Sequence, residues 1–403
     1  MANSIKISAR IIGLMSLGFT LGCQPQNPLS IAIQEAEPIV KKVLEEPKRY
    51  EVQIRYTEIS RTVEGSLQFN SHNLYEDSNV YFYPASTVKL PVAILAMQKV
   101  RELQEAGLSI TADTPFEVYT EDHRAVATID TTKSDQKLTI HHLIKKIFLV
   151  SDNEAYNLLF DFLGRDYINQ NLKRIGLNQT TIHHKFLAGA DNNRTWEYVF
   201  LSQGDTLYYQ PSNSSVTIYS NKGLKGLFKG SGHQNGDEII NDPFDFSQKN
   251  RVSLSDLEGI LTRVLFPEHY SSKQRFSVNT EDYEFLRYWM SRTTLESDDP
   301  NYKGDIRYWD SYVKFFIYGD QKGQMNPEIR SYNKVGDAYG TLTETAYIKS
   351  EKDSIEFLLT ATILSNENGI FNDDNYEYET IGFPFMAGLG RAILAYEKNK
   401  SNP

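Results

Sequence analysis

A serine and a lysine stand three positions apart in the stretch PASTVKLPVAIL, residues 84–95. Positions i and i+3 share one face of a helix, so Ser86 and Lys89 are expected side by side near the start of a helix over residues 86–106. A hydroxyl beside an amine can act as a nucleophile with its general base. The alternative is a serine that only caps the helix and a lysine in solvent, but the apolar residues around Lys89 argue against a solvated side chain.

Two further tripeptides carry groups that could complete such a site. Residues 151–153, Ser-Asp-Asn, supply a second hydroxyl and an amide, and residues 334–336, Lys-Val-Gly, supply a second amine. Each motif is short enough to occur by chance, so the inference depends on their order and contexts. Asp152 is expected to satisfy backbone N–H groups in a tight turn rather than to take part in chemistry.

Together, these three motifs resemble those of the penicillin-recognising serine hydrolases, most closely the class A β-lactamases with their Ser-x-x-Lys, Ser-Asp-Asn and Lys-Thr-Gly. The resemblance covers roughly residues 50–190 and 250–395. It implies an α+β fold, in which an antiparallel sheet flanked by helices joins an all-helical subdomain and the active site lies between them. It also implies acyl transfer through a serine ester, without a metal or organic cofactor.

Physical chemistry agrees with the role that the resemblance gives to Ser86. A hydroxyl at a helix N-terminus lies beside unsatisfied backbone N–H groups, and the helix dipole favours the negative charge formed in acyl transfer. By resemblance, the other oxyanion donor is the backbone N–H of Asp337, directly after Gly336. Lys89, partly desolvated and crowded by Lys334, is expected to have a lowered pKa and to accept the serine proton.

The remaining roles follow from the resemblance. Ser151 would relay the proton to the leaving nitrogen, and Asn153 would exchange hydrogen bonds with a substrate amide. Lys334 would attract a carboxylate and tune Ser151.

Two positions depart from the family pattern. Val335 stands where the family usually has Thr or Ser, which removes a hydroxyl that helps to hold the β-lactam carboxylate. The family's deacylating glutamate lies in a Glu-x-x-Leu-Asn loop, and no such motif follows Ser151. Glu197, in the segment RTWE, is a candidate for this base, although it lies further along the chain than the family position. Without such a base an acyl-enzyme would persist, as in penicillin-binding proteins.

Periodicity defines the elements that must bring these residues together. Residues 50–59 alternate as a strand does, and residues 138–150 and 253–266 predict helices, the second capped by Ser253 or Ser255. Residues 330–348 and 354–364 predict neighbouring antiparallel strands, and residues 383–398 a terminal helix. Strands near both ends predict a sheet shared by the terminal segments of one hydrolase domain, residues 49–403. Residues 192–250, rich in turn-forming residues, are expected to form an inserted lobe.

Charge and spacing limit the partners. The 42 Lys and Arg against 52 Asp and Glu give a net charge of -10 without long blocks of one sign, which argues against a nucleic-acid partner. The histidine doublets at 141–142 and 183–184 do not form chelating pairs, and the acidic segment 366–379 lacks the spacing of a calcium loop. We therefore expect no metal site and a small-molecule or peptidoglycan-like amide substrate. The oligomeric state stays open.

The N-terminal residues predict export. Lys6 and Arg10 precede an apolar run, residues 11–21, that is too short to span a membrane, so residues 1–22 have the layout of a signal peptide. Cys23, the only cysteine of the chain, ends the sequence TLGC, which resembles a bacterial lipoprotein processing site. We expect a lipid anchor at Cys23, a tether and helix over residues 23–48, and a periplasmic or cell-surface location. Ordinary secretion is the alternative.

Three functions follow from these observations. The first is hydrolysis of β-lactams or related amides through a Ser86 acyl-enzyme. The second is a DD-peptidase or transpeptidase that acts on peptidoglycan, and the third is a non-catalytic cell-envelope binding protein on the same fold.

Overall fold

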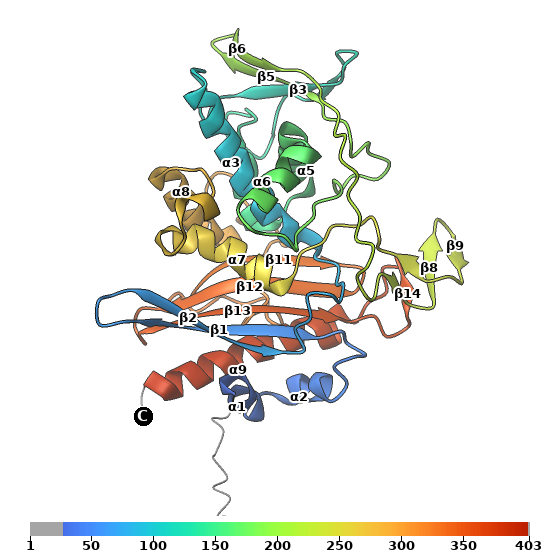
Figure 1. Ribbon diagram of the computed structural model, residues 1–403, viewed down its shortest axis with the longest axis vertical. Helices are drawn as coiled ribbons and strands as arrows, with labels where there is room; N and C mark the ends of the chain where they lie inside the picture. The colour runs from blue at the N-terminus through green and yellow to red at the C-terminus, as the bar shows by residue number, and fades with distance from the viewer. Residues whose placement is uncertain (1–26, 402–403) are drawn as a thin grey trace, which may run out of the picture.

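The centre of the protein is a five-stranded antiparallel sheet in the order β11-β12-β13-β1-β2, seen in a computed structural model that describes residues 27–401 (Figure 1). The predicted leader and Cys23 lie outside the described residues. The strands are β1 Gln53–Arg61, β2 Leu67–Leu74, β11 Arg330–Ala338, β12 Thr341–Ser350 and β13 Ile355–Leu364. Since β1 pairs with β13, the terminal segments share one sheet, as predicted.

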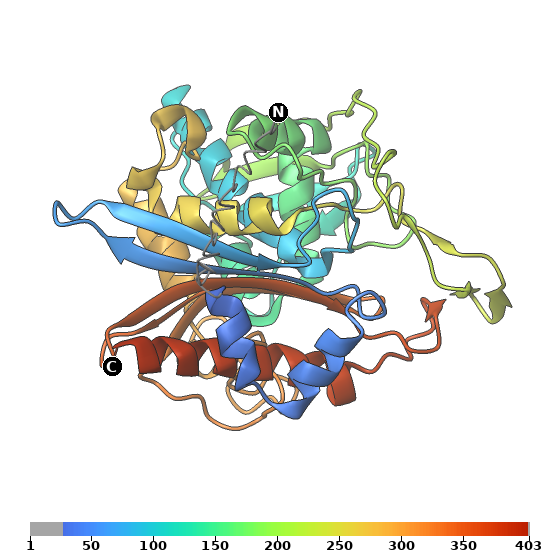
Figure 2. The same cartoon turned by 60° about the horizontal axis from the view of Figure 1, so that its bottom comes forward.

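One face of this sheet is covered by helices from both ends of the chain. Helix α9, Phe383–Ser401, crosses the face with α1, Pro28–Gln34, and α2, Pro38–Glu45, beside it (Figure 2). Pro38 begins α2, where a residue without a backbone N–H is tolerated. Phe385 and Leu389 of α9 are fully buried in the same core as Phe357 of β13. The α+β architecture predicted from the sequence is therefore confirmed.

The other face carries the helical half of the molecule. It contains α3 Lys89–Glu105, α4 Ile140–Val150, α5 Asn153–Leu163, α6 Arg165–Arg174, α7 Leu254–Leu265 and α8 Thr280–Met290. Helix α7 lies directly on the sheet (Figure 1), and it begins where the Ser253 side chain accepts a hydrogen bond from Asp256 N. Apolar residues of α3, α4, α5 and α7 form one continuous core.

The segment 192–250 is divided between two places. Strands β5 Glu197–Ser202 and β6 Asp205–Gln210 extend a sheet that begins with β3 Phe116–Tyr119 and β4 Ala125–Ala127, because Tyr198 and Phe200 bury their rings in the helical core. The short strands β7 Phe228–Lys229, β8 Gly232–Asn235, β9 Glu238–Ile240 and β10 Phe244–Asp245 lie at one end of the main sheet with β14 Ile370–Phe371 (Figure 1).

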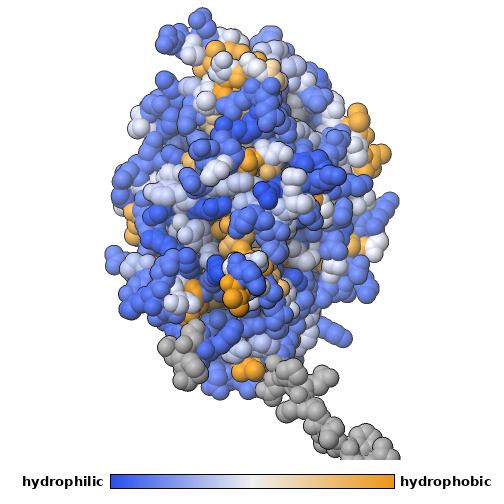
Figure 3. All heavy atoms as spheres, turned by 60° about the vertical axis from the view of Figure 1, so that its left-hand side comes forward, coloured by the Kyte–Doolittle hydropathy of each residue, from blue (hydrophilic) through white to orange (hydrophobic). Residues whose placement is uncertain are grey.

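The face of the molecule seen in Figure 3 is mostly hydrophilic, with small, separate hydrophobic areas. Among residues 27–401 there is no helix with the length and apolar character needed to cross a bilayer.

Candidate active site

A tight turn places Ser86 just before α3. Ala85 has φ 46°, a left-handed conformation that is strained for a residue with a side chain, and residues Ala85–Val88 form a single 3₁₀ turn. Thr87 holds the turn by donating to Pro84 O from its backbone N, at 3.1 Å, and from its Oγ1, at 2.7 Å. Ser86 therefore lies in a 3₁₀ turn, three positions before the first residue of α3, and its side chain is half-buried.

Lys89 is fully buried at the first position of α3. Its Nζ donates to Asn153 Oδ1 at 2.6 Å, to Ser151 Oγ at 3.4 Å and to the backbone oxygen of Ser151. Burial lowers the pKa of Lys89 to about 7, against the opposing charges of Asp152 and Asp337. A substantial fraction of this amine is therefore neutral near pH 7 and able to accept a proton.

Ser151 lies at the junction of two helices. It ends α4 with φ 55°, and its backbone N–H donates to Lys146 O. Asp152 caps α5 by accepting a hydrogen bond from Ala155 N at 2.7 Å, which agrees with the structural role predicted for it. Asn153 is the first residue of α5. The left-handed conformation of one residue thus turns the chain so that a hydroxyl and an amide face the same amine.

Lys334 reaches the same hydroxyl from the sheet. It is 2% exposed on β11, and its Nζ donates to Ser151 Oγ and to Val335 O, each at 2.8 Å. Burial and the charge of Lys89 lower its pKa well below the ordinary value. We call Ser86, Lys89, Ser151, Asn153 and Lys334 the serine–lysine cluster.

Gly336 brings β11 against the turn that carries Ser86. A Cβ atom on Gly336 would lie 2.6 Å from both Pro84 O and Ser86 N, and 2.8 Å from Thr87 N. Only a residue without a side chain permits this approach. Asp337 follows at once and is exposed. The two backbone N–H groups predicted to form the oxyanion hole, those of Ser86 and Asp337, therefore belong to elements in direct contact.

Glu197 is not brought into the cluster. It lies on β5 opposite Tyr119 of β3, and its carboxylate is 3.5 Å from His123 Nδ1. Strand β5 is at the far end of the helical half from β11 (Figure 1). Among the described residues, no hydrogen bond or ion pair joins Glu197 to Ser86, Lys89 or Ser151.

Phe186 is a cluster neighbour that sequence analysis missed. The Nζ of Lys89 lies 5.1 Å from the centre of its ring. Asn157 Oδ1 accepts a hydrogen bond from Phe186 N at 2.7 Å, and the ring of Tyr156 packs at 4.8 Å, so two α5 residues fix it. Within the described part of the chain, the acceptors of the Lys89 amine are oxygens of Ser151 and Asn153, with no carboxylate among them.

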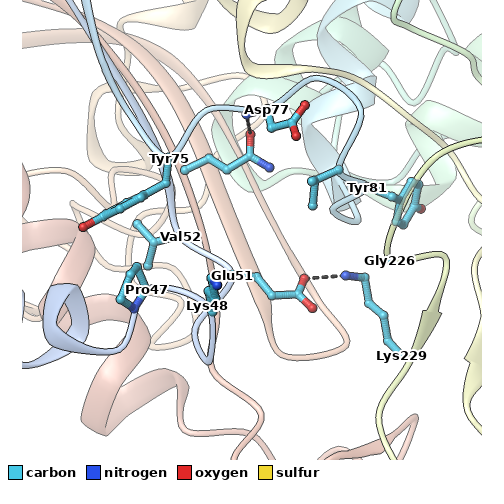
Figure 4. A pocket seen from close by; sticks show the side chains of 11 residues that line it. Pro47, Lys48, Glu51, Val52, Tyr75, Asp77, Tyr81, Gly226 and Lys229 are labelled. Atoms are coloured by element: carbon cyan, nitrogen blue, oxygen red, sulfur yellow. Dashed lines mark hydrogen bonds and ion pairs between the residues drawn. The ribbon is translucent and has the colours of Figure 1, made fainter.

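Two cavities differ in whether they reach the serine–lysine cluster. One, of about 450 Å³, lies between β1 and β7 and is crossed by the Glu51–Lys229 ion pair (Figure 4), and its described lining includes no cluster residue. The other, of about 570 Å³, is polar and is lined by Asp152, Tyr302 and Tyr308. Because Asp152 directly follows Ser151, this second cavity reaches the segment that carries the cluster hydroxyl.

The model of the β-lactamase enzyme family matches residues 39–217, a span that contains Ser86, Lys89 and residues 151–153. A search of curated proteins gives no match. A class A β-lactamase from Mycobacterium abscessus aligns with 16% identity over 89% of this chain and 98% of its own, with a TM-score of 0.48. A β-lactamase from Xanthomonas campestris pv. campestris aligns with 13% identity over 91% of this chain and 97% of its own, with a TM-score of 0.49. PBP-A aligns with 14% identity over 92% of this chain and 97% of its own, with a TM-score of 0.48.

Proposed function

We propose that this chain, whose residues 39–217 match the model of the β-lactamase enzyme family, is a serine hydrolase that cleaves β-lactams or related amides through an acyl-enzyme on Ser86. The observation that carries the proposal is the convergence of two buried amines on one hydroxyl. Ser151 Oγ lies 2.8 Å from Lys334 Nζ and 3.4 Å from Lys89 Nζ. Lys89 follows Ser86 by one helical turn.

Acylation proceeds through defined bond changes in this proposal. Neutral Lys89 accepts the Ser86 hydroxyl proton while Ser86 Oγ attacks the substrate carbonyl carbon. The backbone N–H groups of Ser86 and Asp337 stabilise the oxyanion. When the carbon–nitrogen bond breaks, Ser151 gives its proton to the nitrogen and recovers one from Lys89, which returns to neutrality. The product is a Ser86 ester, and the amine remains tethered if the substrate was a β-lactam.

Lys334 has two tasks in this proposal. It holds the Ser151 hydroxyl, and its positive charge attracts a substrate carboxylate. Val335 is buried and has no hydroxyl to share that second task.

The surroundings of Lys89 favour a second candidate, an enzyme whose acyl-enzyme persists, as in a peptidoglycan DD-peptidase or transpeptidase. Hydrolysis of the ester needs a base that activates water. The apolar ring of Phe186 lies over the Lys89 amine, and Glu197 is held on another sheet. A long-lived ester would then await a nucleophile other than water.

Labelling with a fluorescent penicillin, followed by mass spectrometry over time, tests both candidates. We expect a covalent adduct on the wild type that is lost in Ser86→Ala. Ser66→Ala, which changes an exposed serine in the connection between β1 and β2, should keep it. An adduct that decays within minutes identifies a hydrolase, and one that persists for hours identifies the second candidate. A folded wild type that forms no adduct would contradict both and favour a binding protein.

Export and lipid anchoring through Cys23 form a separate part of the proposal and rest on the sequence of residues 1–23. Metabolic labelling with a radioactive fatty acid should mark the wild type and not Cys23→Ala.

A further inference from the structure

A buried polar network lies directly behind the strand that carries Lys334. Lys314 is 1% exposed, and its Nζ donates to Met290 O at 2.9 Å, to Ser331 O at 3.0 Å and to Asn333 Oδ1. Asn333 in turn donates from Nδ2 to Val313 O at 2.8 Å and to the Glu344 carboxylate. The network therefore ties an amine and a carboxylate to the residue that immediately precedes Lys334.

The geometry of the sheet separates this network from the cluster by one layer of backbone. Neighbouring residues of a strand point to opposite faces, so Asn333 and Lys334 lie on opposite sides of β11. Glu344 of β12 is paired with Val335, and its other oxygen accepts from Phe316 N at 2.6 Å. Glu344 is completely buried. An acid and a base thus face the back of the strand whose front carries the amine bound to Ser151.

Four charged residues influence the pKa of Lys334. Lys89 and Asp337 lie on the cluster side of β11, and Lys314 and Glu344 lie behind the strand. Of this second pair, Lys314 lowers the pKa of Lys334 and Glu344 raises it. The groups that surround Lys314 itself are Glu344, Glu296, Arg330 and Asp310.

We propose that Lys314 and Glu344 are positioning residues that set the charge of Lys334 through the strand, and thereby the pH range in which Ser86 is acylated. The inference rests on the proposed function. The pair is bonded to the strand that carries Lys334. Here two of the three acceptors of Lys314 Nζ, Ser331 O and Asn333 Oδ1, belong to that strand.

Opposite variants should shift the pH profile in opposite directions. Glu344→Gln removes the group whose negative charge raises the pKa of Lys334, so Lys334 should lose its proton at lower pH. Lys314→Met removes the group whose positive charge lowers the pKa of Lys334, so Lys334 should keep its proton to higher pH. One charge acting over several ångströms in a protein of intermediate dielectric corresponds to a shift of about one pH unit. Loss of packing alone would lower the labelling rate of both variants, but it would not shift their pH profiles in opposite directions.

The experiment measures the rate of labelling by a fluorescent penicillin between pH 5 and pH 10 for the full-length protein, with thermal unfolding at each pH. Glu258→Gln is the matched control, because Glu258 is also a buried carboxylate but binds Arg55 and Thr57 at the other side of the sheet. Its profile should stay unshifted. The double variant Lys314→Met/Glu344→Gln should return close to the wild-type profile, and it keeps the test available if one single variant does not fold.

The outcomes separate the two proposals. Profiles of Glu344→Gln and Lys314→Met that coincide with the wild type, or that shift in the same direction, overturn this inference while the proposed function stands. A wild type that is not labelled at any pH overturns the proposed function and this inference with it. Shifts of opposite sign that cancel in the double variant support the inference.

Discussion

At the scale of single residues, Lys89 combines the cost of burial with a capacity for proton transfer. Its pKa of about 7 in the folded protein lies below the ordinary value of 10.5, so between these pH values the unfolded chain binds more protons. The contribution of Lys89 to stability therefore becomes more favourable as pH rises through this window, by at most about 1.4 kcal/mol per pH unit. The residue that destabilises the fold at low pH is the one proposed to accept the serine proton.

Lys89→Met should therefore abolish penicillin labelling and stabilise the protein, with the larger gain at pH 6.5 than at pH 9.5. Urea unfolding at the two pH values measures the gain. Lys99→Met is a matched control on the same helix, because burial also lowers the pKa of Lys99 to about 7 while its Nζ faces Phe162. It should show a similar change in stability and keep the labelling. Loss of labelling in both variants would mean that the effect comes from α3 as a whole.

Phe186 should control how long the ester survives. In Phe186→Ala, water gains access to the neutral Lys89 amine, and we expect the adduct to decay at least about tenfold faster, a small part of what a positioned base contributes. Time-resolved mass spectrometry of the labelled protein measures the decay. Phe285→Ala, which removes a ring stacked on His141 of α4, is the control for a general loss of aromatic packing in the helical half. Equal lifetimes in the wild type and Phe186→Ala would show that the ring does not exclude water.

At the scale of elements, the approach of β11 to the Ser86 turn depends on Gly336. An alanine there would place a methyl group within 3 Å of three backbone atoms, and backbone cannot move aside as a side chain can. Gly336→Ala should cost about 1–3 kcal/mol and remove the labelling, because β11 must retreat from Ser86. Thermal unfolding and labelling measure both effects. Gly323→Ala, where a methyl group meets nothing within 4 Å, should change neither.

The same scale shows what the sequence could predict. Local periodicity was sufficient for α4, α7 and α9, because side chains a few positions apart decide those patterns. It predicts one strand over residues 330–348, but Tyr339 and Gly340 adopt positive φ and divide this segment into β11 and β12, of which only β12 pairs with β13. It could not predict the 3₁₀ turn before α3, which depends on the left-handed Ala85, or the pairing of β5 with β3, which joins segments about 80 residues apart. Phe186 and Lys314 were missed for the same reason, since their partners come from other elements.

At the scale of the whole molecule, the cluster and the terminal helices lie on opposite faces of the sheet, so no residue of α1, α2 or α9 belongs to the cluster. Arg391 of α9 links three segments by donating to Glu37, at 2.6 Å and 2.9 Å, to Asp320, at 2.7 Å and 2.9 Å, and to Ile317 O. A charge network of this kind contributes more than an isolated surface pair.

Arg391→Ala should accordingly lower the free energy of unfolding by about 1–2 kcal/mol, because it removes the hydrogen bonds that join α9 to Glu37 and Asp320. It should leave penicillin labelling at the wild-type rate. Urea unfolding and labelling at a denaturant concentration well below the transition measure the two quantities. Arg307→Ala, which removes an exposed ion pair with the nearby Asp305, should leave the free energy of unfolding close to the wild-type value. A labelling rate that falls together with stability in Arg391→Ala would mean that the two faces of the sheet are coupled, because the strands that carry Lys334 and Gly336 would then respond to the helices behind them.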